Sequence, residues 1–214
     1  MKNLLYLLGL FIRREIRQWS HLLGLILLTW IVAYIVYRII PAMDADLFNF
    51  VYWIFVLLIS INATMRIESH NSPEEHMFFY HLAQPQEVFL AKWLFNTTYI
   101  FVVSSLFFLS LTLFFSEILG LSAAYFVVIL LGSAAISSSM TLVTSLGFSS
   151  NGQNTLVSVL GLPLLIPTVL ILSKAGSQIY NGLEVALVDI YSIFAIMLLS
   201  ISASIFLYPI VWKQ

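Results

Sequence analysis

The chain of 214 residues is 61% hydrophobic and only 9% charged, and its formal net charge is −1. About a quarter of the residues in a soluble domain are charged, so this composition excludes a water-exposed globule and indicates an integral membrane protein. The near-neutral charge argues against a nucleic-acid partner, and the absence of cysteine excludes disulfides, thiolate metal sites and a cysteine nucleophile.

The chain begins with a basic amphipathic stretch, residues 1–20. An apolar run comes first and most of the positive charge follows it, at Arg13, Arg14 and Arg17. This order is the reverse of that in a secretory signal peptide. Because the charges also interrupt the run too often for a membrane span, we predict a helix that lies in the membrane interface.

Six apolar stretches follow, each close to the 20 or so residues that a helix needs to cross the hydrocarbon core. Backbone polar groups in a bilayer must be bonded within their own segment, so each stretch is predicted to be a transmembrane helix. The predicted fold class is an all-α polytopic membrane protein, with one transmembrane domain covering residues 1–214. The six stretches are residues 21–40, 47–66, 93–115, 121–147, 155–173 and 187–209.

Between the second and third stretches, residues 67–92 form the longest polar interruption of the chain. Ser72 and Pro73 are typical of a helix start, and Glu75 stands where a capping-box acid bonds back to the cap. Pro85 closes the stretch, since the residue before a proline avoids helical angles. We therefore predict a short amphipathic helix of about ten residues here, too short to cross a bilayer.

Two interpretations of this short helix are open: it docks into a groove of a partner protein, or it lies on the lipid headgroups. The acids favour docking, because the anionic inner leaflet repels them. The spacing of His70, His76 and His81 fits no single helical face, which favours solvated histidines over a metal site. The residues predicted to form the docking segment are Glu68, Ser72, Pro73, Glu74, Glu75, Met77, Phe78 and Tyr80.

In the fourth predicted span, Ser133, Ser137, Thr141 and Ser145 recur every four residues. Small residues at this spacing let helices approach closely. The alternative is a polar conduit, but hydroxyls bond readily to the preceding turn of their own helix, which favours packing.

The fifth predicted span carries Pro163 and Pro167 on one face. Each proline removes a backbone donor and can kink the helix. The freed carbonyls need neighbours in a bilayer, so we expect this face to pack against other helices. A moving hinge and a static kink both fit the pattern.

The distribution of lysine and arginine predicts the orientation in the membrane. No ionisable residue stands near the middle of a predicted span, which argues against an ion-coupled transporter. If both termini are cytoplasmic, only two of the lysine and arginine residues, Arg38 and Lys174, lie on the outer side of the membrane. The others lie on the cytoplasmic side, namely Lys2, Arg13, Arg14, Arg17, Arg66, Lys92 and Lys213.

The sequence contains no phosphate-binding loop and no known catalytic constellation, so we expect no enzyme activity and an ATPase on a separate chain. Residues 66–92 resemble the corresponding part of the ABC-2-type permeases. The shared pattern is Arg66-x-Glu68, a short polar run, an amphipathic helix, a proline, and Leu90-Ala91-Lys92. The chain is most similar to the CcmB family, the membrane components of the haem exporter of cytochrome c maturation. That similarity covers nearly the whole chain, and its most specific piece is Leu162-Pro163 followed by Ile166-Pro167.

The resemblance implies a permease-like subunit in the bacterial inner membrane that acts in c-type cytochrome biogenesis. Two copies would pair with two copies of an ATPase at the segment 67–92, alongside haem-handling membrane proteins. It implies no directly bound cofactor: the partner binds ATP, and haem is either exported cargo or is released with a loaded chaperone. Apart from His21 at the edge of the first span, no histidine lies within a span as an axial haem ligand. The alternatives are a permease for another cargo, such as a lipid or glycan, and a non-transport membrane scaffold.

Overall fold

The computed structural model describes residues 2–17, 19–40, 43–69, 84–115, 123–147, 153–182 and 185–211. This part of the chain is helical and contains no strand, which confirms the predicted all-α class for the described residues. The helices are α1 (Lys2–Arg17), α2 (Trp19–Ile39), α3 (Ala45–Ser69), α5 (Pro85–Phe114), α6 (Ala123–Gly147), α7 (Gln153–Tyr180) and α8 (Leu187–Val211).

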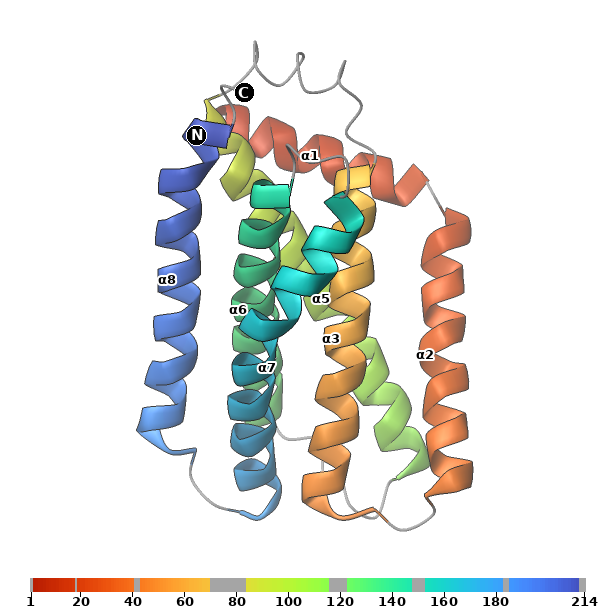
Figure 1. Cartoon of the computed structure of the whole chain (residues 1–214). Coiled ribbons are helices and arrows are strands. Elements are labelled where there is room, and N and C mark those ends of the chain that lie inside the picture. Colours follow the sequence, from red (N-terminus) through yellow and green to blue (C-terminus); the bar gives the residue numbers. More distant parts are fainter. Residues whose placement is uncertain are drawn as a thin grey trace.

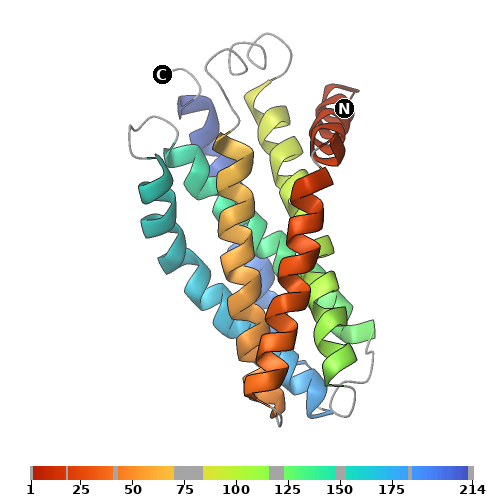
Figure 2. The same cartoon turned by 90° about the vertical axis from the view of Figure 1, so that its right-hand side faces the viewer.

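The helices α2 to α8 run up and down in alternation, and α1 lies across one end of them (Figure 1). At that end α3 stops at Ser69 and α5 starts at Pro85. We call it the α1 end. The opposite end, where α7 turns back into α8, is called the far end. Figure 2 shows α1 at the level of the helix ends, beside the start of α5 and above α2.

The central helix of the bundle is α6, which packs against α3, α5, α7 and α8. Small residues on α6 make these contacts close. At Gly132 a Cβ atom would lie 2.6 Å from the ring of Trp53 in α3. Only glycine therefore lets the buried Trp53 lie this close to the α6 backbone.

Aromatic side chains fill the core between α3, α5, α6 and α7 toward the far end. Tyr52 stacks on Phe107 at a centroid distance of 5.9 Å, and Phe108 stacks on Tyr125 at 4.6 Å. Tyr180, from the end of α7, lies 5.1 Å from the Tyr125 ring. Each such pair contributes about 0.5–1.5 kcal/mol beyond the area it buries. Because lipid tails are as apolar as this core, close packing holds the helices together in a bilayer better than burial alone.

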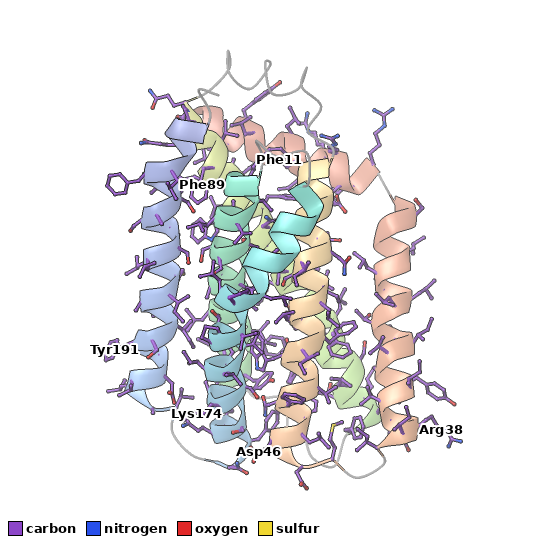
Figure 3. All side chains as sticks on the ribbon, viewed as in Figure 1. Phe11, Arg38, Asp46, Phe89, Lys174 and Tyr191 are labelled. Atoms are coloured by element: carbon purple, nitrogen blue, oxygen red, sulfur yellow. The ribbon has the colours of Figure 1, made fainter. Side chains whose placement is uncertain are left out.

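Five helices, namely α3, α5, α6, α7 and α8, are long and apolar enough to cross a membrane. The apolar part of α2, Leu23–Ile39, is shorter. Large apolar side chains cover the outside of the bundle, as Figure 3 shows along α2 and α8, and Leu199 and Phe206 are 70% and 76% exposed. Such an exterior suits the hydrocarbon of a bilayer and not water.

Two helices extend by seven residues or more beyond one of their predicted limits. α5 begins at Pro85 instead of residue 93, because Pro85 occupies a first-turn position of this helix, with Glu87 beside it. α7 continues to Tyr180, so residues 174–180, which follow the fifth predicted span, are also helical. In both cases side chains of another helix hold the added turns, as described below.

Candidate functional site

The predicted docking segment lies mostly outside the described residues. The backbone of Glu68 belongs to the last turn of α3. The structure does fix the two points between which the segment runs, because α3 ends at Ser69 and α5 begins at Pro85, both at the α1 end. The predicted residues outside the described part are Ser72, Pro73, Glu74, Glu75, Met77, Phe78 and Tyr80.

At the α1 end, α1 packs against the first turns of α5. Leu7 and Phe11 of α1 are buried in one cluster with Val88, Phe89 and Phe95 of α5. The rings of Phe11 and Phe95 lie 5.8 Å apart, and Figure 3 shows Phe11 and Phe89 at this end. The sequence predicted the helix α1 from its amphipathic pattern. The contact of α1 with α5 was missed, because α5 was predicted to begin only at residue 93, after Val88 and Phe89.

The same turns of α5 are joined to α6 by two hydrogen bonds. The Trp93 Nε1 donates to the Ala134 carbonyl at 3.3 Å, and the Ser137 hydroxyl donates to the Trp93 carbonyl at 3.1 Å. Lys92 and Asn96 flank this contact and are only 3% and 2% exposed. The contacts form a continuous path from α1 through the start of α5 to the central helix.

Three of the four residues in the hydroxyl stripe of α6, namely Ser133, Ser137 and Thr141, are buried and hydrogen-bonded. Ser133 donates to the Leu130 carbonyl at 2.9 Å and Thr141 to the Ser137 carbonyl at 2.7 Å. On a neighbouring side of α6, the Ser139 hydroxyl lies 3.2 Å from the Ser200 hydroxyl of α8. These bonds favour helix packing over a conduit as the role of the stripe. The fourth predicted member, Ser145, has its backbone in α6 and its side chain outside the described part.

The prolines of α7 lie inside the helix, which continues through both of them and bends near its middle (Figure 1). Pro163 and Pro167 are exposed, and so is Ile166 between them. The expected packing of this face against other helices is therefore wrong within the described part of the chain. The buried side of α7 carries Leu165 and Leu172 instead. Since this span is apolar on all sides, its sequence could not indicate which face turns inward.

At the far end, a polar clasp that the sequence did not predict joins α7 to α8. Lys174 Nζ donates to Asp189 Oδ1 at 3.0 Å, and Gln178 Nε2 donates to Asp189 Oδ2 at 3.2 Å. The Gln178 Oε1 in turn accepts from the Ala186 N–H at 3.1 Å. The fifth predicted span ended before Lys174. The ion pair with Asp189 was therefore not predicted, and it forms only because α7 continues past Lys174 and α8 contains Asp189.

A second far-end contact joins α3 to α6 and α7. Asn49 is fully buried. Its Oδ1 accepts from the Tyr125 hydroxyl at 2.8 Å, and its Nδ2 donates to the Ala45 carbonyl at 2.7 Å. Gly176 faces this amide so closely that a Cβ atom there would overlap the Asn49 Oδ1. The clasp and this contact together fix the C-terminal half of α7 to its neighbours.

Several polar side chains of the described residues connect one helix to another. Among the described side chains, no three His, Asp or Glu residues come close enough together to hold a metal ion. Their interhelical polar contacts include the two bonds at the start of α5, the clasp between α7 and α8, and the Asn49–Tyr125 and Ser139–Ser200 pairs. This arrangement can pass a displacement at the α1 end to α6 through the start of α5. At the far end, the clasp and the Asn49–Tyr125 contact keep α7 in place against α8, α3 and α6.

The fold and its apolar exterior define the class: the chain is a multi-pass helical membrane protein. Comparison with known protein families, curated proteins and solved structures finds no match to this chain.

Proposed function

We propose that the chain is the permease-like membrane subunit of an ATP-driven complex that acts in c-type cytochrome biogenesis. The observation that carries this proposal is the path of contacts from α1 through α5 to α6, which begins at the start of α5, within the predicted docking segment 67–92. A partner that moves this segment would act directly on Pro85 and the turn after it.

The path suits the transmission of force. Val88 and Phe89 stand in the first turns of α5 and are completely buried. A closely packed core shifts as a unit rather than deforming locally. A displacement of the α5 start would therefore carry α1 with it and act on α6 through Trp93 and Ala134. ATP would be bound and hydrolysed on the separate partner chain.

The biological assignment rests on the resemblance of the segment 66–92 and of the fifth span to the CcmB family. The other parts of the proposal rest on the same resemblance. They are a location in the bacterial inner membrane with both termini in the cytoplasm, two copies of the chain per complex, and haem-handling membrane proteins as further partners. ATP hydrolysis would drive either haem export or the release of a haem-loaded chaperone.

The first experiment purifies the tagged full chain in mild detergent and identifies the copurifying proteins by mass spectrometry. We expect an ATPase together with haem-handling membrane proteins. An ATPase without them would keep the permease role and assign another cargo, such as a lipid or glycan. No ATPase, under conditions that preserve other membrane complexes, would refute the permease role and favour a scaffold.

The docking residues are then tested with the double variant Phe78→Ala/Tyr80→Ala. Central aromatic anchors of an interface each contribute about 2 kcal/mol or more, so we expect recovery of the ATPase to fall at least about 30-fold, with insertion unchanged. The matched control is Tyr191→Ala, an aromatic residue at the far end that is 66% exposed (Figure 3). Equal recovery of ATPase with both variants would contradict docking at this segment.

A further inference from the structure

The surface of α1 has three sides of different chemistry. Leu7 and Phe11 form the side that is buried on α5. Leu5, Ile12 and Ile16 repeat at intervals of seven and four residues, so they share a second side of the helix, and all three are exposed. An apolar side that no other helix of the described chain covers thus adjoins the docked one.

The third side of α1 is basic. Tyr6, Arg13 and Arg17 repeat at the same seven- and four-residue intervals, one position after the apolar side, and all three are exposed. Arg13 and Arg17 are therefore one helical turn apart on the same line. They form a short positive stripe directly beside Ile12 and Ile16.

The position of α1 matches this division. It lies across the bundle at the level of the helix ends, and not between the helices (Figures 1 and 2). The apolar exterior of α2 begins just below it. A helix in this place meets acyl chains on one side and headgroups on another, which is the setting of an interfacial amphipathic helix.

We propose that α1 binds anionic phospholipid headgroups through Arg13 and Arg17 while Leu5, Ile12 and Ile16 enter the acyl chains. Charge complementarity selects this occupant, because guanidinium groups pair with phosphate by two parallel hydrogen bonds. A surface rich in anionic lipid attracts each arginine near it. The lipid then holds α1 from one side while Phe11 holds it from another, so the headgroup composition sets how firmly α1 stays on α5.

The test measures hydrogen exchange of the α1 amides in the purified full chain, by mass spectrometry, in nanodiscs of two compositions. One contains phosphatidylcholine alone and the other contains phosphatidylcholine with phosphatidylglycerol. For the native chain we expect slower α1 exchange in the anionic discs, by about fivefold per arginine. The difference should shrink as salt is added, because exposed charges are screened.

The variant Arg13→Gln/Arg17→Gln should lose this lipid-dependent gain and leave exchange in α6 unchanged. The matched control is Arg38→Gln, which removes an exposed arginine at the far end (Figure 3) and should keep the full gain. Equal α1 exchange in both discs, or an undiminished gain in the double variant, would overturn the proposal. So would a gain that appears only when a copurifying protein is added to phosphatidylcholine discs, since that would assign the stripe to a protein partner.

The apolar side is tested separately, because the chain contains no cysteine and accepts single labels. We place a fluorophore at Ile16→Cys or at Tyr6→Cys and reconstitute each with acyl-chain-brominated lipid. Bromine quenches only a label within the acyl region, so we expect strong quenching at residue 16 and weak quenching at residue 6. Equal quenching would contradict the proposed orientation of α1, even if anionic lipid still slowed its exchange.

Discussion

The contact between Asn49 and Gly176 shows how a single residue determines the approach of two helices. Asn49 must keep its bond to the Tyr125 hydroxyl, because a buried amide without partners costs about 1–3 kcal/mol. Its oxygen occupies the place where any other residue at position 176 would put a Cβ atom. Glycine at this position is therefore a packing requirement of the α3–α7 contact.

We expect Gly176→Ala to destabilise the protein by about 1–3 kcal/mol, because α7 must shift or Asn49 must lose its bonds. The matched control is Gly24→Ala in α2, where a Cβ atom would meet nothing within 4 Å. Alanine there should be neutral or stabilise by about 0.5–1 kcal/mol, as in an ordinary helix. Unfolding of the detergent-solubilised protein by a denaturing detergent measures both. Equal stability of the two variants would contradict the close contact.

The hydroxyl stripe of α6 shows what sequence can and cannot indicate about single residues. The spacing of Ser133, Ser137 and Thr141 identified one helical face in advance. It did not indicate that Ser137 bonds the Trp93 carbonyl, because that pairing depends on the register between α5 and α6. Asn49 and Gly176 carried no signal at all, since they lie far apart in the chain and belong to no motif.

At the scale of elements, hydropathy predicted the apolar helices, and tertiary contacts decided where two of them end. The start of α5 was missed because Pro85 and Glu87, which suit a first helical turn, were assigned to the polar segment 67–92, and because no local pattern records the packing of α1 on Val88 and Phe89. The end of α7 was missed because Lys174 indicates a loop when taken alone, whereas its partner Asp189 lies in the next helix. The orientation of Pro163 and Pro167 was missed because the apolar residues around them face all directions.

The docking of α1 on α5 leads to a prediction for that element as a unit. Phe11→Ala should weaken the docking by roughly 1–3 kcal/mol, less than in a water-surrounded core because lipid can refill the site. Exchange of the α1 amides should then rise at least about fivefold, with α6 unaffected. Tyr6→Ala is the matched control, since it removes an aromatic ring from an exposed side of the same helix. A similar rise in both variants would mean that the Phe11 contact does not hold α1.

At the scale of the whole molecule, α2 decides the topology. Its 21 residues span about 31 Å, which matches the roughly 30 Å of the hydrocarbon core, although its apolar part is shorter. If only the five helices α3, α5, α6, α7 and α8 crossed the membrane, the two chain termini would lie on opposite sides of it. A crossing by α2 returns α1 to the side on which α8 ends, and this is the arrangement of the termini in Figure 1.

Single cysteines in the cysteine-free chain test this topology. Tyr6→Cys and Gln84→Cys report on the α1 end, and Asp44→Cys and Asn181→Cys on the far end, all at exposed positions. With a membrane-impermeant maleimide on intact cells, we expect labelling at 44 and 181, and labelling at 6 and 84 only after permeabilisation. The lysine and arginine bias predicts this direction.

Each other outcome has a definite meaning, because the four positions are separated by known helices. Positions 44 and 181 are separated by α3, α5, α6 and α7 and must label together, which checks those crossings without reference to α2. Labelling of 6 together with 44 would mean that α2 does not cross, so that five spans remain and α1 lies on the outer surface. Labelling of 6 and 84 but not 44 and 181 would keep six spans and invert them. In that case no cytoplasmic ATPase could reach the segment 67–92, and the proposed function would fail with the orientation.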